Sequence, residues 1–353
     1  MTMTTDGSPS GLWGLGARAR RWAAAGAAVA LVGCGAAACS SEGEDANAGG
    51  GEVTTIEHAL GTATIEGKPE RVVTLGQGSA ETAIALGVTP VAMEEYEWGA
   101  DESGYLPWVK EAVEEQGEEL PELVKGMEEL SAEEILGYEP DLILAPFSGI
   151  TQEQYDQLSE IAPTVAYPKD PWTITWDEQI ETVATALGEK DRVDELIDDI
   201  EGEFAAAEKP EYSDTTFSFI YNLGGAGEYG IFMPTEQRVE FVSKLGLKVD
   251  DVVEEFRGET VTGTDSAPIS AENLDQLNSS DIIFTFYLSP EVREELHADP
   301  TYSRIEAIDK GAEVAPEDQS VVTASSLINP LTVPWVLDTY TALIDEAIAN
   351  AQA

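Results

Sequence analysis

The stretch DRVDELIDDIEGEFAAAEK, residues 191–209, predicts one long amphipathic helix near the middle of the chain. Its apolar side chains recur at spacings of three and four residues, so they share one helix face, while acidic side chains cover the other. Pro210 ends the pattern, because proline cannot continue a helix. Such a helix is about 30 Å long, close to the width of a small domain. We therefore expect a connecting helix with a folded lobe on each side and a functional cleft between the lobes.

Both flanks of this helix alternate short apolar runs with helical patterns, which is typical of parallel, doubly wound α/β sheets. Before the helix, a hairpin is expected over 54–65, strands at 71–75, 88–93, 141–145 and 164–167, and helices at 79–86, from 131 and at 151–158. After it, strands are expected at 217–221 and 281–286, and helices at 235–245, 270–277, 302–308 and from 332.

The two flanks also share a pattern of their own. SAEEILGYEPDLILA (131–145) and ISAENLDQLNSSDIIFT (269–285) both predict a capped helix, a turn, an aspartate and a buried strand. We therefore expect an α/β fold of two doubly wound lobes with similar topology. The predicted boundaries are 53–188 for the first lobe, 189–209 for the connecting helix and 210–353 for the second lobe.

Charge and cysteine content exclude several classes of protein. The chain of 353 residues has 68 acidic and 18 basic side chains and a formal net charge of −50. Nucleic acid is excluded as a partner, because its binding requires a basic surface. Strong, dispersed acidity suggests an adaptation for solubility, as in a saline medium. Cys34 and Cys39 are the only cysteines in the sequence, so residues after the N-terminal region contain neither disulfides nor thiolate metal sites.

The first 52 residues resemble an export signal and a tether. Arg18, Arg20 and Arg21 precede the apolar run WAAAGAAVALV (22–32), and LVGC (31–34) resembles the lipobox of bacterial lipoproteins. We therefore expect a signal peptide over 1–33, acylation of Cys34 and a flexible tether over 34–52, which place the protein outside the cytoplasm on the cell membrane. Cys39 is the alternative acylation site, and the arginine pair leaves twin-arginine export open beside the general route.

Motifs for catalysis and cofactor binding are weak. Residues 225–230 match the spacing G-x-G-x-x-G, but an apolar run ending at Pro234 follows instead of a helix, so a glycine-rich hairpin is favoured over a dinucleotide site. The sequence lacks G-x-S-x-G, and neither His58 nor His297 has a recognisable nucleophile or metal-ligand cluster beside it. We predict a protein without enzymatic activity, cofactor or resident metal.

Four long segments resemble the substrate-binding proteins of iron–siderophore ABC importers. They are HALGTATIEGKPERVVTLGQGSAETAIALGVTPVAM (58–93), LSAEEILGYEPDLILAPFSGITQEQYDQLSEIAPTVAY (130–167), ISAENLDQLNSSDIIFTF (269–286) and NPLTVPWVLDTYTALIDEAI (329–348). The resemblance implies two α/β lobes joined by one long helix with little relative motion. It also implies a monomer that captures a ferric siderophore and delivers it to the permease. Haem or a corrinoid remains an alternative ligand on this scaffold, and a siderophore-ester hydrolase is the alternative from another class.

The resemblance also implies site residues. Each lobe of such proteins carries an exposed glutamate that docks onto permease arginines, and the matching positions are Glu153 and Glu240; ordinary solvated carboxylates are the alternative. Ligands of parallel sheets lie beyond the carboxyl ends of the strands. The stretch 96–108 is expected to be a loop whose aromatic residues as a group line an apolar pocket, with core packing as the alternative for each one. Arg257, like Arg238, is expected to reach the cleft, with pairing to a nearby carboxylate as the alternative. The ligand-binding candidates are Gln77, Trp98, Phe147, Trp172, Tyr229, Phe232, Arg238, Tyr287 and Asn329. The scarcity of basic residues favours a neutral or cationic hydroxamate chelate over a highly charged catecholate.

Overall fold

The computed structural model describes residues 53–126, 129–222, 229–261 and 264–353. They belong to one compact unit, Gly49–Ala353. The predicted signal peptide and tether, with Cys34 and Cys39, lie outside the described residues, as do Gly225 and Gly227 of the glycine-rich motif. Within the described ranges, no helix combines the length and the apolar character needed to cross a membrane.

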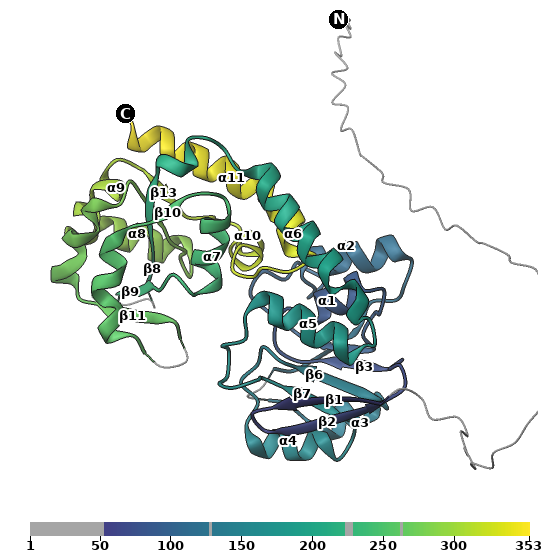
Figure 1. Ribbon diagram of the computed structural model, residues 1–353. Coiled ribbons are helices and arrows are strands. Elements are labelled where there is room, and N and C mark those ends of the chain that lie inside the picture. The colour runs from purple at the N-terminus through teal and green to yellow at the C-terminus, as the bar shows by residue number, and fades with distance from the viewer. Residues whose placement is uncertain (1–52, 127–128, 223–228, 262–263) are drawn as a thin grey trace, which may run out of the picture. The chain divides into compact units, whose positions relative to one another are not determined.

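The first lobe contains a 5-stranded parallel sheet in the order β5-β4-β3-β6-β7, with an antiparallel hairpin of β1 and β2 against β7 (Figure 1). Every residue of β3 and β6 is buried, as expected for central strands covered on both faces. The strands are β1 (Val53–His58), β2 (Gly61–Glu66), β3 (Val72–Thr74), β4 (Ala92–Glu94), β5 (Glu122–Val124), β6 (Leu142–Ala145) and β7 (Thr164–Ala166). The helices are α1 (Ser79–Ala85), α2 (Pro107–Gln116), α3 (Ala132–Gly137), α4 (Gln152–Ser159) and α5 (Trp176–Ala186).

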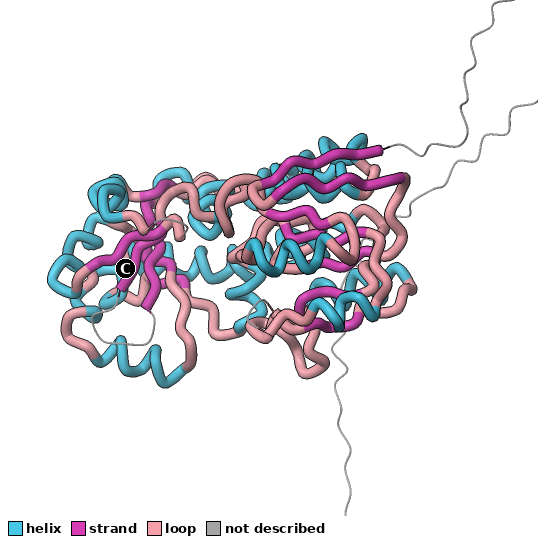
Figure 2. Tube along the Cα trace, turned by 90° about the horizontal axis from the view of Figure 1, so that it is seen from below, coloured by secondary structure: helices cyan, strands magenta, loops and turns pink. Residues whose placement is uncertain are grey.

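The second lobe is built on a 6-stranded mixed sheet in the order β11-β9-β8-β12-β13, with β10 paired to β8. In it β8, β10, β12 and β13 are parallel, whereas β9 and β11 are antiparallel additions. The strands are β8 (Thr216–Asn222), β9 (Tyr229–Phe232), β10 (Lys248–Val249), β11 (Ser266–Ile269), β12 (Ile282–Phe284) and β13 (Glu313–Val314). The α-helices are α7 (Gln237–Lys244), α8 (Pro290–Ala298), α9 (Glu306–Asp309), α10 (Gln319–Ala324) and α11 (Thr332–Ala351), and the 3-10 helices are η2 (Tyr212–Asp214), η3 (Asp251–Glu259), η4 (Ala271–Ser279) and η5 (Tyr302–Arg304). Figure 2 shows the two sheets as separate groups of strands, so the α/β fold of two lobes is confirmed.

The helix predicted over 191–209 is present as α6 (Val193–Ala207), preceded by the 3-10 turn η1 (Lys190–Arg192). Its buried residues are Leu196, Ile200 and Phe204, on the predicted apolar face. The helix packs against α5, α7 and α11, and α11 runs beside it (Figure 1). Trp335 of α11 also contacts Trp108 of the first lobe, with ring centroids 5.3 Å apart. The chain therefore connects the lobes through α6, and α11 braces that connection.

Two expectations about individual elements are wrong. The stretch 96–108 is not one loop, because α2 begins at Pro107 and places Trp108 in the core, where it is 2 % exposed. None of the aromatic residues of this stretch lines either cavity described below. The helix predicted at 270–277 is the 3-10 helix η4, in which the buried residues Leu274 and Leu277 are three positions apart. That spacing matches the repeat of a 3-10 helix rather than the 3.6 residues of an α-helix.

Candidate ligand site

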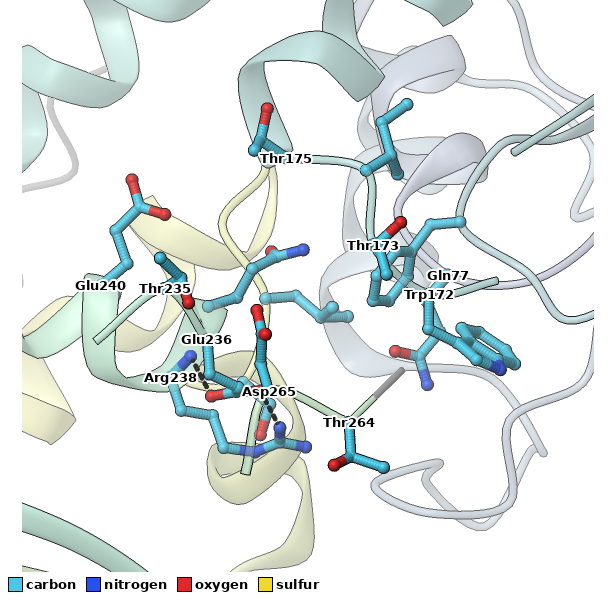
Figure 3. A pocket seen from close by; sticks show the side chains of 15 residues that line it. Gln77, Trp172, Thr173, Thr175, Thr235, Glu236, Arg238, Glu240, Thr264 and Asp265 are labelled. Carbon is cyan, nitrogen blue, oxygen red and sulfur yellow. Dashed lines mark hydrogen bonds and ion pairs between the residues drawn. The ribbon is translucent and has the colours of Figure 1, made fainter. Parts of the chain in front are cut away.

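Residues of both lobes line a cavity of about 470 Å³ (Figure 3). The first lobe contributes loops that follow β3, β6 and β7, and the second contributes the start of α7 and the segments before β11 and α11. A cavity of this size lies within the range of small-molecule sites, about 300–1,000 Å³. The lining residues are Gln77, Phe147, Trp172, Thr173, Ile174, Thr175, Thr235, Glu236, Gln237, Arg238, Glu240, Thr264, Asp265, Ser326 and Leu327.

The first-lobe wall is held by backbone contacts between loops. Gly76 has a φ of 72°, and a Cβ there would lie 2.1 Å from the carbonyl oxygen of Phe147, so only glycine fits. The next residue, Gln77, donates its N–H to the same carbonyl at 3.2 Å. Gln179 of α5 donates to the Gln77 carbonyl at 2.5 Å. These contacts fix the Gln77 backbone where its side chain enters the cavity (Figure 3).

Phe147 and Trp172 form the aromatic part of this wall. Their ring centroids are 5.3 Å apart at an interplanar angle of 82°, an edge-to-face contact. Trp172 remains 37 % exposed, and its φ of 61° is rare for a residue other than glycine. Its N–H donates to the carbonyl of Ser148 at 3.3 Å, which helps hold this unfavourable backbone. Backbone strain of this kind is concentrated at functional sites, so Trp172 is a strong candidate for ligand contact.

The second-lobe wall is organised around Arg238, which points into the cavity in Figure 3. Its guanidinium lies over the rings of Phe232 at 5.0 Å and Phe286 at 5.8 Å. It also forms an ion pair with Glu236, the N-cap residue of α7. Burial raises the pKa of Glu236 above its ordinary value, and the charge and hydrogen bonds of Arg238 offset only part of that effect. The aromatic rings and the carboxylate thus fix the direction of the guanidinium.

Two N–H groups of this wall are buried without a hydrogen-bond partner in the part of the chain that the structure describes. They are Nε of Arg238 and Nε2 of Gln237. The amide of Gln237 is oriented by its oxygen, which accepts the N–H of Ile328 at 3.2 Å. Rotating the amide would lose that bond, so Nε2 remains the free group. Buried donors are normally satisfied, and two free donors beside one cavity indicate a ligand with acceptor oxygens.

Glu240 joins the cavity to a contact between the lobes. It accepts a hydrogen bond from Nε1 of Trp176, at the start of α5, at 2.8 Å. Lys244 lies 3.7 Å from the same carboxylate, 2.6 Å from Glu201 of α6 and 4.9 Å from the centroid of the Trp176 ring. We call Trp176, Glu201, Glu240 and Lys244 the clamp. It connects α5 and α6 to α7.

The structure brings Gln77, Phe147, Trp172, Arg238 and Glu240 of the predicted residues to this cavity. The other ligand candidates have different surroundings. Phe232 lies beneath Arg238, Tyr229 stacks on Tyr302, and Tyr287 lines a second cavity. Asn329 accepts the N–H groups of Leu331 and Thr332, and the Trp98 carbonyl accepts from Thr323 of α10. Sequence reasoning did not select Gln237, although its position beside Arg238 at the start of α7 was a usable signal.

Two further predicted residues lie on the surface. Glu153 is exposed in the first turn of α4. Arg257 is paired with Glu254 at 2.5 Å on exposed 3-10 helix η3. Among the residues with described positions, no group of three or more His, Cys, Asp and Glu side chains is arranged to hold a metal ion.

Comparison with known proteins gives consistent relatives. The family profile for periplasmic binding proteins matches residues 72–312. A protein of Bacillus subtilis (strain 168), YfiY, described as a probable siderophore-binding lipoprotein, is 26 % identical over 273 residues, which cover 76 % of this chain and 78 % of that protein.

Solved structures agree with this assignment. The structure of PiaA from Streptococcus pneumoniae TIGR4 in complex with ferrichrome has a TM-score of 0.75 and 31 % identity, covering 84 % of this chain and 99 % of PiaA. The structure of Staphylococcus aureus SirA with staphyloferrin B has a TM-score of 0.62 and 26 % identity, covering 85 % of this chain and 98 % of SirA. The two-lobed fold, the cavity between the lobes and these matches confirm the resemblance seen in the sequence. The chain belongs to the periplasmic binding protein family, among the substrate-binding proteins of iron–siderophore ABC importers.

Proposed function

We propose that this chain, as a monomer, captures a ferric siderophore outside the cytoplasm and delivers it to the permease of an ABC importer. The cavity between the lobes supports this function, since it is lined from both sides and has the size of a small-molecule site. The relatives support it as well: YfiY is described as siderophore-binding, and PiaA was solved with ferrichrome. We further propose that the chain acts by binding alone, without turnover of its ligand.

We propose a neutral or cationic hydroxamate chelate as the ligand. The buried donors Nε of Arg238 and Nε2 of Gln237, which have no partner among the described residues, support a ligand rich in acceptor oxygens, and the charge of the cavity carries the choice between the two kinds of chelate. Hydroxamate and amide oxygens are acceptors that suit such donors. The same cavity contains the carboxylates of Glu236, Glu240 and Asp265, which repel a chelate of high negative charge. The exposed faces of Phe147 and Trp172 suit the apolar stems of the chelate.

Fluorescence quenching of the purified protein tests this proposal. We expect a ferric trihydroxamate to bind at least about tenfold more tightly than a ferric tricatecholate, a difference of about 1.4 kcal/mol. Gln237→Leu removes one free donor and should weaken hydroxamate binding, whereas Gln276→Leu, outside both cavities, should not. Preference for the catecholate would contradict the ligand class. Binding of haem or a corrinoid, seen by its own absorption, in place of any iron chelate would contradict the function.

Docking to the permease is a separate proposal. Glu153 is exposed, whereas Glu240 is engaged by Trp176 and Lys244 beside the cavity. We therefore expect Glu153→Gln to lower uptake by the transporter while leaving chelate affinity unchanged, and Glu240→Gln to change affinity as well. Glu160→Gln, at the other end of α4, is the matched control. A loss of chelate affinity in Glu153→Gln would contradict a docking role.

We propose that acylation of Cys34 holds the protein on the outer face of the cell membrane. Relatives described as lipoproteins support this location. Cys34→Ser should release the protein from the membrane fraction, and Cys39→Ser should not. The reverse result would assign the lipid to Cys39.

A further inference from the structure

A second cavity of about 320 Å³ lies in the second lobe and shares no lining residue with the first. Its lining comes from two segments, one following β12 and one following β13. These strands are parallel neighbours, with Phe284 opposite Val314. Their carboxyl ends therefore open at one edge of the sheet, where α/β proteins bind ligands. The lining residues are Tyr287, Ser289, Pro290, Arg293, Glu294, Pro316, Glu317 and Gln319.

A network of side-chain hydrogen bonds and an ion pair holds the inner wall of this cavity together. The hydroxyl of Tyr287 donates to Glu313 and lies 2.8 Å from the Tyr302 hydroxyl and 3.2 Å from Nε2 of His297. The Glu313 side chain is only 4 % exposed, and Arg293 lies 3.4 Å from its carboxylate. Burial alone would raise the pKa of Glu313, but hydrogen bonds from His297 and Tyr287, together with the charge of Arg293, hold it below the ordinary value. Glu313 therefore places a negative charge next to the hydroxyl of Tyr287.

Gln319, the first residue of α10, presents an unused acceptor. Its Nε2 donates to the carbonyl of Tyr287 at 3.1 Å. Its Oε1 is buried and has no hydrogen-bond partner within the described ranges. Exchanging the two atoms would set Oε1 against the Tyr287 carbonyl, so the amide cannot satisfy itself by rotation. Gln319 lines the cavity, and an N–H or O–H group on a ligand there would satisfy this acceptor.

The charges around the cavity indicate which kind of ligand group fits it. Arg293 is already paired, with Glu313 and, at 3.0 Å, with Glu317. Glu294 adds a further carboxylate to the lining. Carboxylates thus outnumber the single guanidinium, which disfavours an anionic group and favours a cationic one. Pro290, Pro316 and the Tyr287 ring supply apolar surface for a short hydrocarbon stem.

We propose that this cavity is a second ligand subsite, which takes an ammonium or amide N–H group on a short apolar stem and hydrogen-bonds it through Oε1 of Gln319. The group has two possible sources. One is a pendant arm of the iron chelate, which rests on the function proposed above. The other is a free small amine, which does not.

Three probes and two variants test the subsite by isothermal titration. The probes are a linear ferric trihydroxamate ending in a primary ammonium, the same chelate ending in methyl, and butylammonium alone. Gln319→Leu removes the acceptor, and Glu294→Gln removes one exposed charge without touching the core. We expect Gln319→Leu to lower the affinity for the ammonium chelate about tenfold, the effect of losing one hydrogen bond to a charged group. Its affinity for the methyl chelate should fall less than about twofold. Glu294→Gln should also lower the affinity for the ammonium chelate. Gln276→Leu, outside both cavities, is the control and should leave both affinities unchanged.

The outcomes separate the two sources. If Gln319→Leu weakens binding of the ammonium chelate but not of the methyl chelate, the subsite takes the pendant arm of the chelate. If butylammonium binds the unchanged protein and not Gln319→Leu, the subsite takes a free amine. Equal effects on both chelates, with no butylammonium binding, would overturn the subsite. If neither chelate binds the unchanged protein, the proposed function fails, and the butylammonium titration still decides the subsite.

Discussion

Glu81, in the first turn of α1, shows how one buried group sets a pH dependence. It is 3 % exposed, and its carboxylate accepts a hydrogen bond from Nε1 of Trp108 at 3.2 Å. Burial raises the pKa of Glu81 above 4.5, and the backbone and Trp108 hydrogen bonds offset this only in part. Because the pKa of Glu81 is higher in the folded state than in the unfolded state, the protonated side chain contributes stability that is fully present below the unfolded-state pKa. It is lost as the pH rises through the folded pKa.

Glu81→Gln should therefore stabilise the protein at pH 7 to 8 and have little effect near pH 4. The amide keeps an acceptor for Trp108 and carries no charge to desolvate. Each kcal/mol corresponds to a rise of about 2–4 °C in Tm for a domain of this size. Thermal unfolding of both proteins across the pH range checks the expectation. A Tm difference that is constant with pH would show that ionisation of Glu81 is not the cause.

At the same scale, the sequence predicted some site residues and missed others for physical reasons. Gln77 is predicted because it follows an apolar strand, and Arg238 because it follows the glycine-rich segment. Both residues line the cavity. Tyr229 also lies at a strand terminus, yet it stacks on Tyr302, from a segment 73 positions away (302 − 229). Whether a side chain at the end of a strand is buried or faces the cavity depends on such partners, which are distant in the sequence. The donors of Gln237 and Arg238 that lack a partner among the described residues likewise become visible only when the acceptors around them are placed.

At the scale of elements, the clamp predicts how the lobes are held. Trp176→Phe keeps an aromatic ring under Lys244 but removes the N–H that Glu240 accepts. The carboxylate is partly exposed, so we expect a loss of about 1 kcal/mol, below the range of about 1.5–3 kcal/mol for bonds to charged groups. If the bond holds the lobes around the chelate, dissociation should become about fivefold faster.

Trp335→Phe is the matched control for this prediction. It also removes an indole N–H that faces a glutamate of the first lobe, Glu111, at 3.5 Å. Trp335 lines neither cavity, so its substitution should leave the dissociation rate unchanged. Stopped-flow displacement of the chelate measures both rates. Equal acceleration in the two variants would mean that indole loss between the lobes, not the clamp, sets the rate.

The elements themselves were largely predictable, because alternating apolar runs and capped helices are local signals. The N-cap of α3 is one example: Ser131 accepts the N–H of Glu134 at 3.2 Å, as its capping pattern predicts. The start of α2 is not predictable from this pattern, because the apolar spacing of 96–108 is irregular and a proline suits a turn as well as a first helical residue. The bracing of α6 by α11 was also invisible, since an amphipathic pattern does not name the helix that it faces.

For the whole molecule, the net charge of −50 has a consequence for stability. The exposed ion pairs, such as Lys190–Glu181 at 3.3 Å, contribute about 0–1 kcal/mol each, and salt weakens them. With 68 acidic against 18 basic side chains, however, most carboxylates cannot be paired, and their mutual repulsion opposes folding. Screening this repulsion should outweigh the loss of ion pairs, so salt should stabilise the protein.

We therefore expect Tm to rise with NaCl, by at least about 3 °C, which corresponds to about 1 kcal/mol. The shape of the rise identifies its cause. The Debye length falls from about 10 Å at 0.1 M to about 3 Å at 1 M, so screening acts mostly below that concentration. A rise that occurs only above about 1 M would instead reflect salting-out of apolar surface. A fall in Tm over the low range would mean that the ion pairs, not the excess of carboxylates, dominate the electrostatics of the fold.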